Sequence, residues 1–95
     1  MRVRYRARAL ADIEEIRSYL EKRSPVGARN VLRAIRSGIK FIAENPQASE
    51  RTDDPGVRVK VLLDYPYKIF YSVHPEHVEI LNVRHSARRP WEEGV

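Results

Sequence analysis

The chain of 95 residues contains no cysteine, so neither a disulfide nor a thiolate metal site can support its fold. This absence suits a reducing cytoplasm, which is the location we expect. No apolar run is long enough to span a bilayer, and no apolar stretch follows the basic start Met1–Arg6, which argues against a signal peptide. A Ser-His-Asp set, a metal-ligand spacing and a phosphate-cradling glycine loop are also missing. We therefore expect no metal and no cofactor.

Positive charge is in excess. Lys and Arg number 18 against 13 Asp and Glu, a net charge of +5, and Arg dominates the basic set. The guanidinium group presents a rigid fork of donors that suits carboxylates and phosphates. Such a surplus favours an anionic partner, either nucleic acid or an acidic protein segment, although a merely soluble surface is the alternative. The length predicts a single domain, residues 1–95.

The first half of the chain predicts a strand and two helices. Alternation over residues 2–6 is typical of a strand, and apolar residues at helical spacing predict an amphipathic helix over about residues 8–22. Ser24-Pro25 predicts the capped start of a second helix that runs to about Glu44. Glycine inside that helix, at Gly38, costs about 1 kcal/mol relative to alanine, and close approach of the first helix would offset this.

The second half predicts a small sheet. A loop over residues 46–56 leads to a strand over Val57–Leu63, and a hairpin follows, with strands Pro66–Val73 and Val78–His85. The order is β-α-α-β-β-β. It predicts an α+β fold in which a helical hairpin covers one face of a mostly antiparallel sheet. The other sheet face is left to solvent or to a partner.

We expect this uncovered sheet face to be basic. If the valines of the strand after residue 56 point at the helices, Arg58 and Lys60 point away from them. Lys68 and Phe70 of the next strand would join these cations. A basic sheet that carries an aromatic ring suits RNA, because phosphates pair with the cations and bases stack on the ring. A solvated face is the alternative.

The second helix carries a basic stripe, formed by Arg29, Arg33, Arg36 and Lys40. Their spacing of 4, 3 and 4 places all four on one narrow strip of the helix, where like charges repel one another. The stripe is suited to receive an acidic helix or a phosphate backbone. Alternatively, Asp or Glu residues of the first helix neutralise it.

A second basic cluster follows the last strand and consists of Arg84, His85, Arg88, Arg89 and Trp91. His85 is a candidate general acid or base at neutral pH, and the arginines are suited to stabilise charge on a phosphorane-like state. Alternatively, His85 is only a contact residue.

Four segments stand out by their order and spacing, namely Ala9–Ile16, Glu44-Asn45-Pro46, Tyr67–Tyr71, and Ile80–His85 with Arg88. Together they resemble the ParE/RelE superfamily of small toxins from bacterial toxin–antitoxin modules. The resemblance covers essentially the whole chain. It implies a bacterial cytoplasmic toxin that an acidic, partly disordered antitoxin holds inactive. The basic stripe is then the expected antitoxin-binding surface.

The resemblance leaves two mechanisms open. ParE-like members poison DNA gyrase and have no hydrolytic centre, and the long second helix and the tail beyond the last strand favour this interpretation. RelE-like members cut mRNA in the ribosome, and Lys60, Lys68, Arg84 and His85 would then be the catalytic candidates. In either case the expected target-binding set is Arg58, Lys60, Lys68, Arg84, His85, Arg88, Arg89 and Trp91.

Overall fold

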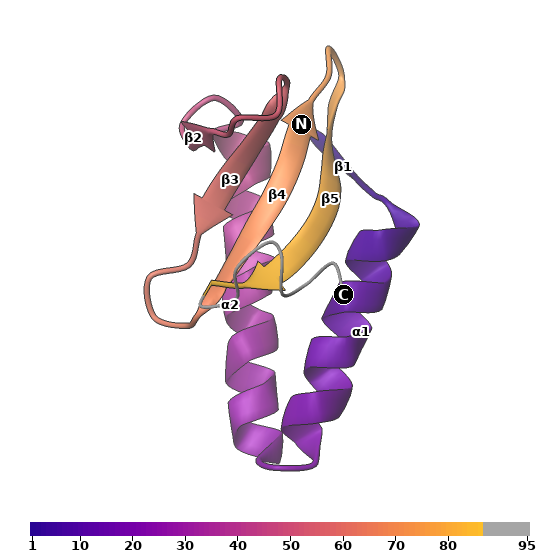
Figure 1. Cartoon of the computed structure of the whole chain (residues 1–95), viewed down its shortest axis with the longest axis vertical. Helices are drawn as coiled ribbons and strands as arrows, with labels where there is room; N and C mark the ends of the chain where they lie inside the picture. The colour runs from indigo at the N-terminus through magenta and orange to yellow at the C-terminus, as the bar shows by residue number, and fades with distance from the viewer. Residues whose placement is uncertain (87–95) are drawn as a thin grey trace.

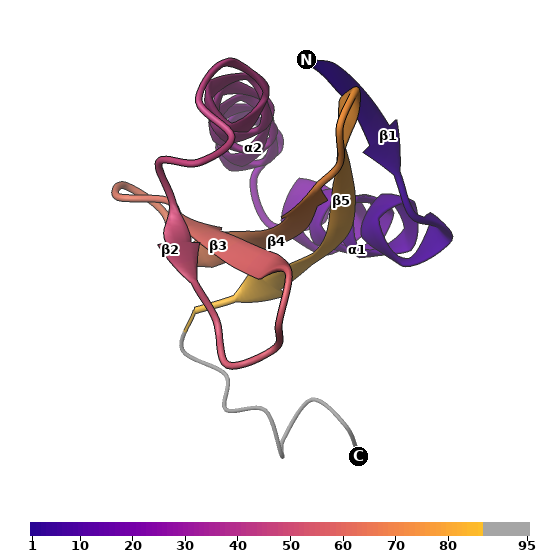
Figure 2. The same ribbon diagram turned by 90° about the horizontal axis from the view of Figure 1, so that it is seen from above.

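The computed structural model describes residues 1–86, which form two helices packed on one face of a five-stranded sheet (Figures 1 and 2). The elements are β1 (Arg2–Tyr5), α1 (Ala7–Glu21), α2 (Pro25–Glu44), β2 (Glu50–Arg51), β3 (Val57–Val61), β4 (Tyr67–Val73) and β5 (His77–His85). The α+β fold and the order of helices and strands expected from the sequence are confirmed, with one short strand added.

The strands lie in the order β1-β5-β4-β3-β2 across the sheet. β1 is parallel to β5, with Val3 opposite Val78, whereas the other neighbouring strands are antiparallel. Strand β5 is therefore enclosed between β1 and β4. The added strand β2 lies within residues 46–56, where we expected only a loop. With two residues it presents few unpaired backbone groups at the sheet edge.

Helix α2 begins and ends where the pairs Ser24-Pro25 and Asn45-Pro46 predict. The Ser24 hydroxyl oxygen accepts a hydrogen bond from the Gly27 N–H at 3.0 Å, and Pro25 is the first helical residue. The last helical residue, Glu44, is followed by Asn45-Pro46, as expected. The capping bond satisfies one of the backbone donors that a helix start leaves without an intrahelical partner.

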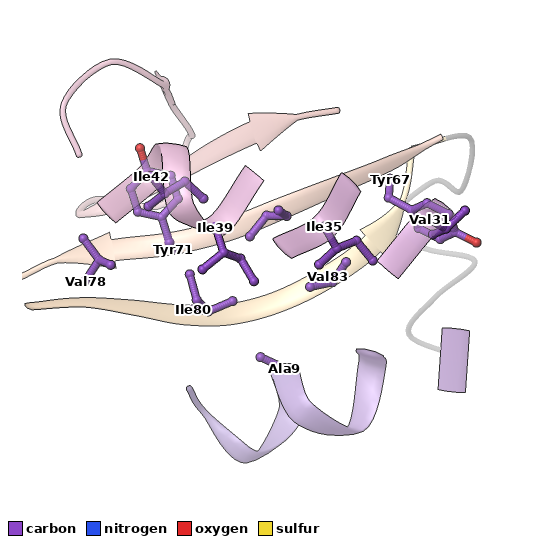
Figure 3. Close-up of a cluster of buried hydrophobic side chains, with 11 residues drawn as sticks. Ala9, Val31, Ile35, Ile39, Ile42, Tyr67, Tyr71, Val78, Ile80 and Val83 are labelled. Atoms are coloured by element: carbon purple, nitrogen blue, oxygen red, sulfur yellow. The ribbon is translucent and has the colours of Figure 1, made fainter. Parts of the chain in front are cut away.

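The core lies between α2 and the two long strands. In Figure 3 the apolar side of α2 lies over β4 and β5, with side chains from both layers in contact. The α2 side chains Ile35, Ile39 and Ile42 pack in one cluster with sheet residues, among them Tyr71, Ile80 and Val83. Burial of one such side chain contributes about 1.5–3 kcal/mol, so this layer is the main source of stability.

Gly38 is required by the sheet side of α2, not by α1. A Cβ atom at this position would lie 2.9 Å from Leu62 Cδ2 and 3.0 Å from Ile69 Cδ1. The expectation that Gly38 admits the first helix was therefore wrong. The glycine lets the segment after β3 approach the helix backbone, and this close approach offsets its low helix propensity.

Strand β3 faces the opposite way from our expectation. Arg58 pairs with Tyr71 and Lys60 with Ile69, and both partners are fully buried beneath the helices. Residues directly opposite in a sheet share a face, so Arg58 and Lys60 lie on the helix side. The valines of β3 therefore lie on the uncovered side, where Val61 is 46% exposed. Alternation defines two faces of a strand, but only the pairing with β4 decides which is covered.

Tyr71 links the core to the loop after α2, because its buried hydroxyl group donates a hydrogen bond to the Pro46 carbonyl oxygen at 2.9 Å. We expect Tyr71→Phe to lower the free energy of unfolding by about 1 kcal/mol, since one hydrogen bond is lost without a change in packing. Urea denaturation of Tyr71→Phe beside Tyr65→Phe measures this. The Tyr65 hydroxyl has no hydrogen bond within residues 1–86, so its removal should change stability much less. Equal effects would contradict the assignment.

Candidate functional site

The basic stripe of α2 is exposed along its whole length. Arg29, Arg33, Arg36 and Lys40 all face solvent, and within residues 1–86 none of them forms an ion pair. Four like charges on one strip of helix destabilise it slightly. The structure thus leaves the stripe open to an anionic partner.

The acidic residues of α1 do not neutralise this stripe. Glu14 and Glu21 both pair with Arg17 on their own helix, at spacings of three and four residues. The hydrogen bond from Arg17 lowers the pKa of Glu14, and the same bond, with that to Glu21, raises the pKa of Arg17. These groups lie at the surface in contact with water, so the pairs contribute little to stability. Their carboxylates are nonetheless engaged within α1.

A groove of about 460 Å³ lies beside the stripe, between α2 and the loop that joins β3 to β4. Its lining residues are Asn30, Arg33, Ala34, Ser37, Gly38, Phe41, Lys60, Leu62, Leu63, Asp64 and Tyr65. Arg33 belongs to both the stripe and the groove. Leu63 is 93% exposed, which is unusual for leucine, and Phe41 on the opposite wall is 38% exposed. The groove therefore combines open apolar walls with cations, a combination that the sequence analysis missed because it depends on the β3–β4 loop.

Lys60 lines this groove on the helix side of the sheet and does not lie on the uncovered sheet face. Its ammonium nitrogen lies 4.5 Å from the centroid of the Phe41 ring, a cation–π contact between β3 and α2. Such contacts contribute about 0.5–1 kcal/mol at exposed sites. The contact holds the ammonium group at the mouth of the groove.

The four catalytic candidates do not share one face of the sheet. Lys68 lies opposite Arg84 on the uncovered face, where the Arg84 Nε donates to the Asn82 side-chain oxygen at 3.2 Å. Lys60 lies on the helix side. His85 lies there too, opposite Tyr67, with the two rings edge to face and their centroids 5.3 Å apart. The sheet therefore separates the candidate base from the cation pair that would stabilise charge on a phosphate.

Arg58, which we expected to contact a target, also supports the loop after α2. Its guanidinium group donates to the backbone oxygens of Gln47 at 3.2 Å and Ser49 at 2.8 Å, and to the Gln47 side-chain oxygen at 2.6 Å. These bonds join β3 to the segment that enters β2. Arg58 is thus placed for a structural role.

Asp12 is a buried carboxylate that the sequence analysis did not single out. It is 7% exposed, and one carboxylate oxygen accepts a hydrogen bond from the Val83 N–H at 3.0 Å. The other accepts from Arg8 Nε at 2.9 Å. Val83 lies close to an irregularity at which the pairing of β4 with β5 skips Leu81. Asp12 therefore ties α1 to the strand that carries Arg84 and His85.

Three target-binding candidates, Arg88, Arg89 and Trp91, lie outside the described residues. Within residues 1–86, no group of three or more His, Cys, Asp or Glu residues could hold a metal ion. In the same part of the chain, neither helix has the length and apolar character needed to cross a membrane.

Comparison with known proteins identifies the family to which this sequence is related. Residues 3–90 match the family described as ParE toxin of the type II toxin–antitoxin system parDE. The protein Y4kP of Sinorhizobium fredii is 37% identical over 90 residues, which is 95% of this chain and 92% of that protein. The toxin RelE2 of Caulobacter vibrioides is 35% identical over 81 residues, which is 85% of this chain and 90% of that protein.

The fold has a solved counterpart in the chromosomal ParDE toxin–antitoxin system of P. aeruginosa. The TM-score is 0.77 at 24% sequence identity, over 90% of this chain and 95% of that one. At this identity the structural likeness shows only a shared fold. The family match and the two sequence relatives show which family the chain belongs to. On the match over residues 3–90, this chain belongs to the ParE toxin family of type II toxin–antitoxin systems.

Proposed function

We propose that this toxin acts in the cytoplasm as a ParE-like inhibitor of DNA gyrase and that it contains no hydrolytic centre. The observation that carries the proposal is the division of the four catalytic candidates between the two faces of the sheet. A general base must lie within hydrogen-bond reach of the proton that it removes. With His85 beside Tyr67 and the pair Lys68–Arg84 on the other face, these residues do not form one site around a phosphate.

A RelE-like ribonuclease is the second candidate, and a specific observation favours it. The relative from Caulobacter vibrioides that is 35% identical is named toxin RelE2. In that mechanism Lys68 and Arg84 on the uncovered face would bind the mRNA backbone, with Phe70 beside them as a stacking surface. Cleavage would then require a base other than His85.

We further propose that a cognate acidic antitoxin neutralises the toxin by binding the basic stripe of α2. The four cations of the stripe are exposed and have no ion-pair partner within residues 1–86. Arginine can bind a carboxylate through two parallel hydrogen bonds, so a row of three arginines suits a helix that carries Asp or Glu.

A supercoiling assay with DNA gyrase and the antitoxin-free chain tests the first proposal. We expect inhibition, or plasmid trapped in its cleaved form, and we expect His85→Ala to retain it because His85 is not a catalytic base. Ribosome-bound mRNA incubated with the same preparation should remain intact. Normal supercoiling together with mRNA cleavage that is lost in Lys68→Gln would establish the ribonuclease instead.

A further inference from the structure

We propose that the groove between α2 and the β3–β4 loop binds an acidic peptide segment of a partner protein and takes up one of its aliphatic side chains. The carboxylates of the segment would bind Arg33 and Lys60, while the aliphatic side chain lies between Phe41 and Leu63. This inference rests on the proposed function in one respect, the acidic partner. It adds an apolar determinant that the basic stripe does not supply.

Small residues on α2 shape the groove. Ala34, Ser37 and Gly38 lie along it, so no large side chain of the helix fills the space. Because Gly38 lacks a Cβ atom, Leu62 packs against the helix backbone and the loop after it forms the opposite wall. The result is an open depression of about 460 Å³, large enough for a side chain from another protein.

The walls of the groove expose large apolar side chains to solvent. Leu63, in the β3–β4 loop, is 93% exposed. Phe41, on the helix side, is 38% exposed under the Lys60 ammonium group. Contact with one aliphatic side chain would remove parts of Phe41 and Leu63 from water together, which is the favourable term in most protein associations.

The charges around the groove select an acidic partner. Arg33 and Lys60 line it and form no ion pair within residues 1–86, although Asp64 also lies in the lining. Elsewhere the chain pairs Arg6, Arg8 and Arg17 with carboxylates. Cations left unpaired beside apolar walls complement a segment that carries both carboxylates and an aliphatic residue.

The same features disfavour the other possible occupants. A second copy of this chain would bring two sets of these cations together, and each chain has a net charge of +5. Nucleic acid would satisfy the cations through its phosphates, but it has no aliphatic group to cover Leu63.

Fluorescence anisotropy with a labelled, helix-forming peptide of Glu and Leu residues tests the proposal. Two matched peptides separate its parts, one with Leu replaced by Ser and one with Glu replaced by Gln. The protein variants are Leu63→Ser, which alters a fully exposed loop residue, and Ala34→Leu, which fills the groove from α2. Lys22→Gln is the control, since Lys22 is an exposed cation at the end of α1 with no partner within residues 1–86.

We expect each groove variant to weaken binding about tenfold, the change expected when one leucine loses most of its apolar burial, and Lys22→Gln to leave it unchanged. Both altered peptides should bind more weakly than the parent peptide. The proposal is overturned if the Leu-to-Ser peptide binds as well as the parent, because charge alone would then explain binding. Equal affinity of the wild type and both groove variants would overturn it too. So would a competition experiment in which a short DNA duplex displaces the labelled peptide at a lower concentration than the unlabelled peptide does.

This result is independent of the gyrase assay. A chain that binds the peptide through the groove but leaves gyrase active would retain the inference and lose the proposed target. A chain that inhibits gyrase but does not distinguish the peptides would retain the target and lose the inference.

Discussion

Asp12→Ala is expected to lower the free energy of unfolding by about 2–3 kcal/mol, a large part of the stability of so small a domain. The Asp12 carboxylate is buried, and its bond to the Val83 N–H joins α1 to β5. Alanine would leave that backbone donor without its acceptor. Urea denaturation followed by circular dichroism measures the change.

Two further variants separate the causes. Asp12→Asn keeps one carbonyl oxygen that can accept from the Val83 N–H, so it should lose less stability than Asp12→Ala. Glu15→Ala removes an exposed carboxylate of the same helix that has no partner within residues 1–86, and we expect a change within about 0.5 kcal/mol. Equal stability of Asp12→Ala and Glu15→Ala would contradict the role assigned to Asp12.

Charge reversal along α2 is expected to weaken binding of the acidic antitoxin at least about 100-fold, since like charges placed face to face cost several kcal/mol. The variant combines Arg29→Glu, Arg33→Glu and Arg36→Glu. Its helix should remain about as stable, because three negative charges repel one another much as the three arginines did, while position 36 gains an attraction to Lys40. The partner for this test is the acidic antitoxin that the family resemblance implies. Calorimetric titration measures its affinity, and growth on co-expression shows whether the toxin is neutralised.

A control of equal charge distinguishes the stripe from overall electrostatics. Arg2→Glu, Arg4→Glu and Arg51→Glu together change the net charge by the same amount on exposed residues of β1 and β2. We expect this variant to bind the antitoxin nearly as well as the wild type at physiological salt, where exposed charges beyond about 8 Å are screened. Similar losses in both variants would indicate a general attraction and not a defined surface.

Local patterns in the sequence were sufficient wherever one residue or one helix face decides the outcome. Ser24-Pro25 and Asn45-Pro46 bound α2 because capping and the rigid proline ring act within a few residues. The spacing of the basic stripe placed its four side chains on one exposed strip for the same reason. The two-residue strand β2 was missed because nothing local distinguishes two paired residues from a loop.

Local patterns were insufficient wherever two segments distant in sequence meet. The alternation of β3 was recognised, yet its covered face was assigned wrongly, because Lys60 opposite Ile69 is a fact of register with β4. The partner of Gly38 was misassigned to α1 when it is Leu62 and Ile69. Asp12 looked like any acidic residue of a helix surface, since its Val83 partner lies 71 residues further along the chain.

The sequence by itself therefore determined the α+β order, the bounds of α2, the basic stripe and the resemblance to the ParE/RelE superfamily. Only the tertiary structure decided that Lys60 lines a groove with Phe41 and that His85 lies across the sheet from Lys68 and Arg84. The physical reason is that periodicity fixes which side chains share a face of one element. Strand register and helix docking fix which faces meet, and they depend on packing between residues far apart in the chain.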